Sequence, residues 1–208
     1  MADTILDRWG LSAEELTQIV DSNPSLRGFM LGYVGEFQLR KIWFSDKRTS
    51  NVHKSDDHDR RKKNDLSVTY QGYESTLEVK SLQTLSVKRE GETYAGNFQC
   101  DASDSRTITL PNGEQVKTTC LLVGEFDVLA VNLFAFRGQW DFAFALNRDL
   151  PRSTYSGYTL KQRKYLLATS MKITWPAQPP FVTDPFILLD RFVDKKAARY
   201  RALTKTKK

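Results

Sequence analysis

The stretch DLSVTYQGYESTLEVKSL, residues 65–82, carries the clearest structural and chemical signals in this 208-residue chain. Residues 66–70 and 73–82 are two short runs in which β-branched and aromatic side chains recur, a composition typical of strands. Gln71-Gly72, which stands between them, is a turn signal. The stretch therefore predicts a β-hairpin.

Three side chains of this hairpin are expected to meet. Glu78 and Lys80 project to the same side, because successive strand residues point to opposite faces. Asp65 begins the partner strand, where the twist of a hairpin can bring it beside them. Val79, between the other two, turns its side chain toward the core, and its carbonyl is a further candidate metal ligand. Two carboxylates and one ammonium at one point can hold Mg²⁺ and act on a water or a phosphate.

These groups match the needs of phosphodiester cleavage, which requires a positioned water, a Lewis acid on the phosphate and stabilisation of developing charge. Asp65 and Glu78 would be the oxygen ligands, and Lys80 would orient the water, help to remove its proton or stabilise the charge. The alternative is an exposed salt-bridged strand pair that contributes little to stability. The acid-x-Lys spacing alone is unspecific, since Asp194 and Lys196 repeat it in a segment that we interpret as solvated charge.

The charge balance favours a polyanionic partner. The net charge is +6 and the isoelectric point is about 9.3, and lysine and arginine neutralise phosphates and release counterions. The candidate phosphate contacts stand immediately before Asp65: Arg60, Arg61, Lys62 and Lys63. A solvated loop is the alternative for this cluster, and the basic run that closes the chain fits a solvated end equally well.

Residues 98–106 are rich in hydrogen-bonding groups. Gln, Asn and Arg side chains can bind base edges bidentately, and Asp can accept from cytosine. Together with the turn at residues 111–114, this makes residues 94–122 a possible DNA-recognition insertion. Its candidate contacts are Gln99, Asp101, Arg106 and Asn112. A polar excursion built on Asx turns is an equal alternative.

Other polar residues near the hairpin are harder to assign. His53 and His58 lie among aspartates, but their spacing matches no zinc site, so a solvated loop bordering the active site is the better interpretation. Asp127 precedes an apolar run, where it either supports the active site or caps a strand.

Composition and cysteine use indicate a globular cytoplasmic protein. Apolar residues make up 40% of the chain, and Cys100 and Cys120 are expected to be a reduced pair. Residues 1–4 are acidic and lack an apolar stretch, so we expect no secretory signal. The apolar run at residues 126–136 is too short to cross a bilayer, so no membrane partner is expected.

The pattern along the chain predicts helices, then a run of strands, then helices, in one domain over residues 1–208. This order favours an α/β fold with a mixed central β-sheet flanked by α-helices. The expected segments are a short helix after the Ser12 capping box, a helix at 24–44, a polar loop at 46–64, the hairpin, strands at 93–100, 106–110, 115–122, 126–136 and 140–146, and helices at 159–170 and 185–201.

Asp65 and the Glu78-Val79-Lys80 triplet resemble the PD-(D/E)XK nucleases, the restriction-endonuclease-like superfamily. Asn64 stands where many members have proline. Many members also carry a glutamate on the helix before the hairpin, and Glu36 occupies that place here. The resemblance covers roughly residues 26–146 and implies a restriction-endonuclease-like fold.

The resemblance also implies a function. It points to a Mg²⁺-dependent endodeoxyribonuclease that cuts double-stranded DNA, of the restriction type, working as a homodimer. Asp65 and Glu78 would bind the metal, Lys80 would position the water and Glu36 would assist. Two alternatives stay open: a repair or recombination nuclease that recognises DNA structure, and a non-catalytic nucleic-acid-binding module.

Overall fold

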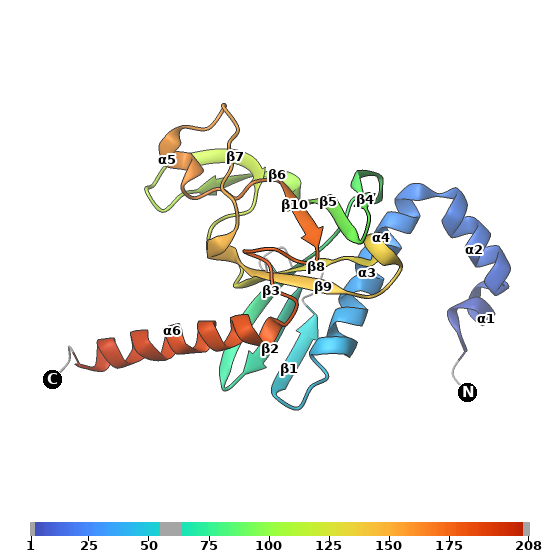
Figure 1. Cartoon of the computed structure of the whole chain (residues 1–208), viewed down its shortest axis with the longest axis horizontal. Helices are drawn as coiled ribbons and strands as arrows, with labels where there is room; N and C mark the ends of the chain where they lie inside the picture. The colour runs from blue at the N-terminus through green and yellow to red at the C-terminus, as the bar shows by residue number, and fades with distance from the viewer. Residues whose placement is uncertain (1–2, 55–63, 206–208) are drawn as a thin grey trace.

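A five-stranded mixed sheet forms the centre of the computed structural model, which describes residues 3–54 and 64–205 (Figure 1). The strand order is β1-β2-β3-β8-β9; β3 and β8 run parallel, and the other neighbours are antiparallel. The strands are β1 Thr49–Lys54, β2 Leu66–Tyr70, β3 Tyr73–Ser81, β8 Val128–Asn132 and β9 Phe142–Leu146. The predicted mixed sheet with flanking helices is confirmed.

The hairpin β2–β3 closes through a two-residue loop. Tyr70 pairs with Tyr73, and Gln71 and Gly72 both have positive φ, of 48° and 78°. Two positive φ values give the turn a twist that matches the twist of the flanking strands. The predicted hairpin is thus confirmed to within one residue.

The strand β8 is buried on both faces, as its apolar sequence predicts. Leu129 and Val131 contribute to the core on one face, whereas Val128 and Ala130 contribute to the core on the other. The apolar run nevertheless leaves the strand at Asn132, because residues from Phe134 to Arg137 form the short helix α4. The predicted strand at 126–136 was therefore too long.

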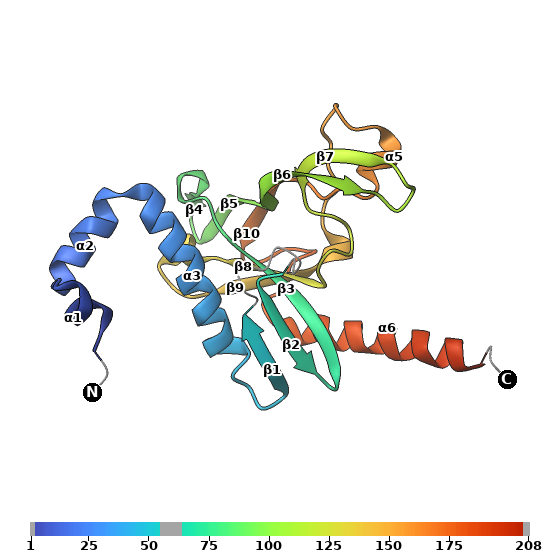
Figure 2. The same cartoon turned by 180° about the vertical axis from the view of Figure 1, so that it is seen from behind.

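Two helices cover one face of the sheet (Figures 1 and 2). The helix α3, Pro24–Trp43, begins with proline at its first turn and packs Leu39 against the sheet. The helix α6, Pro185–Lys205, places Phe186, Leu188 and Leu189 in the same core. Both helices were predicted, although α6 extends further than expected.

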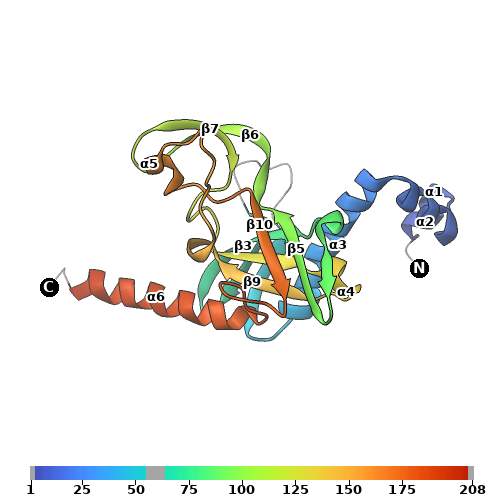
Figure 3. The same ribbon diagram turned by 45° about the horizontal axis from the view of Figure 1, so that its top comes forward.

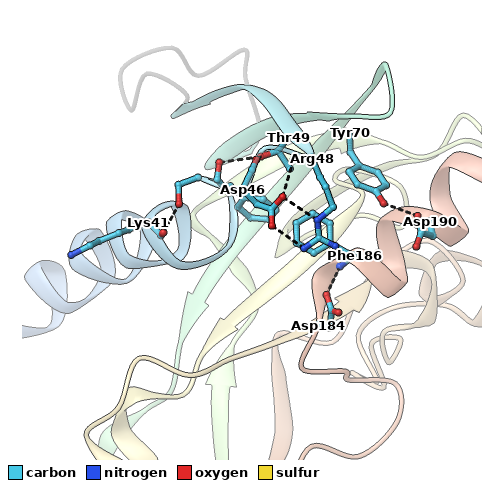
Figure 4. Close-up of polar contacts among 10 residues, drawn as sticks. Lys41, Asp46, Arg48, Thr49, Tyr70, Asp184, Phe186 and Asp190 are labelled. Carbon is cyan, nitrogen blue, oxygen red and sulfur yellow. Dashed lines mark hydrogen bonds and ion pairs between the residues drawn. The ribbon is translucent and has the colours of Figure 1, made fainter.

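Arg48, in the turn between α3 and β1, contacts the start of α6 (Figure 4). Its guanidinium binds both carboxylate oxygens of Asp46 at 3.0 Å and lies 3.5 Å from the ring centroid of Phe186. Beside it, the Tyr70 hydroxyl donates to Asp190 at 2.7 Å. These contacts fix the first turns of α6 against β2.

A second sheet covers the opposite face of the central sheet. It consists of β10 Ser170–Trp175, β5 Thr93–Gln99 and β4 Lys88–Glu90 in that order, and Figure 3 shows β5 and β10 crossing in front of β9. Phe98 and Ile173 from these strands are buried against the residues of β8.

A separate lobe projects beyond the second sheet (Figure 3). It contains the hairpin β6 Asp101–Thr109 and β7 Gln115–Cys120, together with the four-residue helix α5, Leu160–Arg163. A small core of its own holds it together, formed by Ile108, Leu110, Val116, Cys120 and Leu166. Cys100 and Cys120 are both buried and form no disulfide.

Two predicted segments were wrong. The predicted polar loop contains the edge strand β1, which has a single apolar residue, Val52, and depends on pairing with β2. The helix predicted at 159–170 stops at Arg163. Leu166 and Leu167 instead form β-bridges with distant residues, and β10 begins at Ser170. In both places long-range pairing outweighs the local pattern.

The chain also has two projecting helical ends. The helices α1 Ile5–Trp9 and α2 Ala13–Ser22, followed by the start of α3, extend from one side of the sheet, and α6 extends from the other (Figures 1 and 2). As predicted, α2 begins with a capping box formed by Ser12 and Glu15. No helix in the described part of the chain is long and apolar enough to cross a membrane.

Candidate active site

The hairpin positions Asp65 through two hydrogen bonds to β3. The Asp65 N–H donates to the carbonyl of Leu77 at 3.0 Å, and the Val79 N–H donates to Oδ2 of Asp65 at 2.7 Å. Leu66 pairs with Leu77 in the register of the hairpin, so Asp65 lies beside Glu78 at the edge of the site. The Asp65 carboxylate is thereby held against the backbone of the triplet.

The buried Glu78 and the half-buried Lys80 form an ion pair on the face that carries the second sheet. The Lys80 ammonium lies 2.7 Å from Oε1 of Glu78 and donates to the carbonyl of Asp101 at 3.3 Å. Glu78 is only 7% exposed. The two residues are thus salt-bridged, as the alternative expects, but Glu78 is not exposed. The structure brings Asp65, Glu78 and Lys80 together.

Burial shifts the protonation of this pair. Burial raises the pKa of Glu78 to about 7; the positive charge of Lys80 opposes this rise, and the charge of Asp65 adds to it. Burial acts to lower the pKa of Lys80, but the charge of Glu78 and its hydrogen bond raise it above the usual value. Lys80 is therefore an ammonium at neutral pH, whereas Glu78 can be held as either form.

The thiol of Cys100, which lies beside the pair, is not a nucleophile in this environment. Burial raises its pKa to about 12, and the thiolate is the reactive form.

The donor set fits Mg²⁺. Asp65 and Glu78 offer two hard carboxylates, and Mg²⁺ is commonly held by one or two carboxylates with waters and substrate phosphate completing its ligands. Among residues 3–54 and 64–205, no group of three or more His, Cys, Asp or Glu side chains is placed to hold a metal.

Glu36 reaches the neighbourhood of the site from α3. Its Oε2 lies 2.9 Å from the ammonium of Lys54, and Lys54 is paired with Leu66, the residue after Asp65. Leu66 and Leu77 belong to the core under α3, so Glu36 approaches from the face opposite to Glu78. Its assistance to the metal remains a prediction.

Comparisons with known proteins leave the family open. No protein-family profile matches the sequence. No curated protein matches it either. Among solved structures the chain is similar to a bacterial homing endonuclease, I-Ssp6803I, with 15% identity over 68% of this chain and 87% of that chain and a TM-score of 0.33.

The candidate DNA-binding residues lie in different structural environments. Gln99 is exposed at the end of β5, and the carbonyl of Asp101 binds Lys80 at the site. Asn112 lies in the β6–β7 turn, where its side chain is bonded to Glu114. The fourth candidate, Arg106, is held inside the lobe and is considered below. Their DNA contacts remain predictions.

Arg106 makes a bidentate ion pair with Glu125, at 2.5 and 2.6 Å. The Glu125 side chain is only 4% exposed, and it also accepts from the Leu122 N–H at 2.7 Å. Arg106 thus joins β6 to the turn before β8, and a contact with a base would require it to leave this carboxylate.

The structure gives the remaining polar candidates, Asp127 and His53, contacts other than the three site residues. Asp127 binds the N–H and the hydroxyl of Thr76 at 2.9 and 3.1 Å, so it ties β3 to the start of β8, which is the capping alternative. His53 lies exposed on β1, with Nδ1 3.2 Å from the carbonyl of Asn51. The predicted basic cluster and the second histidine lie outside the described residues: Arg60, Arg61, Lys62, Lys63 and His58.

Two partners of the site were missed from the sequence. Lys54 stands in a segment with no strand-like pattern, so nothing local points to its pairing with Glu36. The Asp101 carbonyl is a backbone group brought over Lys80 by the β5–β6 junction. Neither has a sequence signal, because each contact depends on the packing of distant segments.

Proposed function

We propose that this chain is a Mg²⁺-dependent endodeoxyribonuclease that hydrolyses phosphodiester bonds in double-stranded DNA, of the restriction type. The observation that carries the proposal is the convergence of the half-buried Asp65 and Lys80 on the buried carboxylate of Glu78. Double-strand cutting with one such site per chain requires two chains, so the proposed active form is a homodimer.

Asp65 and Glu78 would hold the ion, and the carbonyl of Val79 is a further candidate ligand. A bound Mg²⁺ supplies a Lewis acid for the scissile phosphate. The hydrogen bond from the Val79 N–H orients the Asp65 carboxylate before any ligand arrives. Glu78 must lose its proton to act as a ligand, and its raised pKa makes this step sensitive to pH near neutrality.

Lys80 would act by its charge. An ammonium has three N–H donors, and two of them are directed to Glu78 and to the Asp101 carbonyl. The third can donate to the attacking water or to a phosphate oxygen. Because its pKa is raised, Lys80 suits orientation of the water and stabilisation of developing negative charge rather than removal of the proton.

A cleavage assay on supercoiled plasmid and phage DNA with Mg²⁺ tests the proposal. Glu78→Ala and Lys80→Ala should abolish cleavage, whereas Asp194→Ala should not, because Asp194 belongs to the exposed acid-x-Lys triplet on α6. Equal activity in all four proteins would overturn the assigned site.

The same assay separates the other functions that the sequence leaves open. Discrete fragments indicate sequence-specific restriction, whereas a preference for flaps, nicks or ends indicates a repair or recombination nuclease. DNA binding that persists in EDTA, with no cleavage under any condition, indicates a non-catalytic module.

A further inference from the structure

The helical arm α1–α3 leaves an unusually large apolar surface uncovered. In the described part of the chain, neither α1 nor α2 has a buried residue. Trp9, Phe29, Tyr33 and Phe37 are all at least half exposed. Helices of 5 and 10 residues are marginal in water unless an apolar face is packed against something. The arm therefore needs a covering partner.

The helix α3 has two apolar faces that point in opposite directions. Gly35 and Leu39 face the sheet and are buried. On the other side Leu26, Met30, Tyr33 and Phe37 follow each other at intervals of 4, 3 and 4 residues, and each is at least 36% exposed. That spacing is the seam of a helix that packs against another helix. A helix that is apolar on opposite faces is normally covered on both.

The size of the uncovered surface suits a dimer. Aromatic side chains present about 150–250 Å² each, so the four half-exposed rings leave on the order of 400–500 Å² uncovered. Aliphatic residues of the arm extend this surface: Ile5, Ile19, Leu26, Met30 and Val34. The sum approaches the roughly 800 Å² that each partner buries in a specific complex.

The charge of the arm argues for a second copy as the partner. Residues 3–22 carry five acidic side chains and one basic one, Arg8. Such a surface repels phosphate groups, which argues against DNA and anionic lipid. Residues 24–43 carry three basic side chains and one acidic one. The two halves of the arm are thus oppositely charged. Two arms packed antiparallel would place the acidic half of each on the basic half of the other.

We infer that α1–α3 is a homodimerisation surface, in which the seam of α3 packs against the arm of a second copy of this chain. Two α2–α3 units then complete one helical bundle with a shared core. Tyr33 lies in the seam and also contacts Lys54, whose ammonium is 4.2 Å from the ring centroid and 2.9 Å from Glu36. The helix α3 therefore carries both the seam and Glu36, the residue that approaches the candidate active site.

The inference gives the proposed homodimer a surface, but its test needs neither DNA nor Mg²⁺. Light scattering after size exclusion should give the full chain a mass of twice 23.9 kDa. Phe37 lies in the seam, and Phe29 flanks it, three residues after Leu26 and four before Tyr33. Phe29→Asp and Phe37→Asp should each raise the dissociation constant of the dimer at least about 30-fold, and together they should yield a monomer. Leu85→Asp is the matched control, because Leu85 is fully exposed outside the arm, and this variant should remain dimeric.

Folding and geometry are checked separately. Phe29 is 70% exposed, so Phe29→Asp should not disturb the core. The contribution of the β-sheets to its circular dichroism should match that of the wild type. Cys100 and Cys120 are buried, so a short bis-maleimide should join Phe29→Cys chains into a covalent dimer and leave Leu85→Cys chains single. A monomeric wild type at micromolar concentration would overturn the inference. Binding of the wild type to anionic vesicles would also overturn it if Phe29→Asp abolished that binding. Either result would count against the proposed dimer but not against the site of Asp65, Glu78 and Lys80, which lies within one chain and is tested by the cleavage assay.

Discussion

The ammonium of Lys80 lies 2.7 Å from Oε1 of Glu78, whose residue is only 7% exposed. A buried ion pair is a poor source of stability, because desolvation of the two charges offsets their attraction. A pair of this kind beside a third charged group, Asp65, is more simply explained by chemistry, since strongly shifted pKa values cluster at functional sites.

Replacing Lys80 by methionine tests the role of its charge. Lys80→Met keeps most of the side-chain volume but removes the charge, so the cleavage rate should fall about 10²–10³-fold, as for loss of one donor to developing charge. The pKa of Glu78 should rise further in this variant, because in the wild type the positive charge of Lys80 lowers that pKa. Single-turnover rates and carbon NMR of labelled glutamate measure the two effects. An unchanged rate would remove Lys80 from the mechanism.

The stability of the protein without metal should fall as pH rises from about 4.5 to about 7. The folded pKa of Glu78 is raised to about 7 from an ordinary value of 4.5, so over this window the unfolded chain loses the proton and the folded chain keeps it. The unfolded state then binds fewer protons, and the free energy of unfolding decreases with pH. Below about pH 4.5 Glu78 is protonated in both the folded and the unfolded state, so it adds no pH dependence to the free energy of unfolding.

Mg²⁺ should reverse this trend. The ion binds the carboxylate form, so it should raise the melting temperature at pH 8 and have little effect at pH 5, by the linkage between binding and folding. Thermal unfolding at both pH values, with and without Mg²⁺, measures this. Glu78→Gln serves as the control in which the Mg²⁺ effect should be lost; a Mg²⁺ effect of the same size in this variant would place the ion elsewhere.

Local pattern predicted the hairpin well and the edges of the fold poorly. The two-residue turn and the alternation of β2 and β3 are encoded within 18 residues, so the approach of Asp65 to Glu78 could be inferred from them. The strand β1 has only Val52 as an apolar signal, and it forms because its backbone pairs with that of β2. In β10, Met171 and Ile173 do alternate with exposed residues, so this strand had a signal that the helical interpretation of the preceding segment concealed.

Three glycines of α3 provide a test of its packing on the sheet. A Cβ on Gly35 would lie 2.9 Å from Nδ2 of Asn132. Asn132 cannot move freely, because it donates to Ser81 and accepts from the Phe134 N–H. Gly35→Ala should therefore destabilise the protein by about 1–3 kcal/mol.

Gly28→Ala and Gly32→Ala are the matched controls, because a Cβ at either position meets nothing within 4 Å. Each should leave stability unchanged or raise it by up to about 1 kcal/mol, since alanine favours a helix interior over glycine. Denaturant unfolding of the three variants measures the difference. Equal effects at all three positions would contradict the close approach of α3 to Asn132.

The Arg106–Glu125 pair should matter more for stability than for DNA binding. Glu125→Ala would leave a mostly buried guanidinium without its carboxylate, so it should cost about 3–5 kcal/mol. Asp141→Ala breaks the exposed pair with Arg137 and should cost at most about 1 kcal/mol. Gln99→Ala, at an exposed position, is expected to weaken DNA binding without a change in stability. A stable Arg106→Ala variant with weakened DNA binding would instead favour direct readout by Arg106.

Glu36 and Lys54 can be separated by a pair of substitutions that each remove one charge of the same ion pair. If Glu36 supports the ion from behind Asp65, Glu36→Gln should raise the Mg²⁺ concentration for half-maximal cleavage by about 10–100-fold, the usual cost of losing an outer partner of a metal site. Lys54→Met leaves the Glu36 carboxylate in place and removes a competing cation, so it should leave that concentration unchanged or lower it. Equal losses in both variants would mean that Glu36 acts only by holding Lys54, and hence the start of β2, in position.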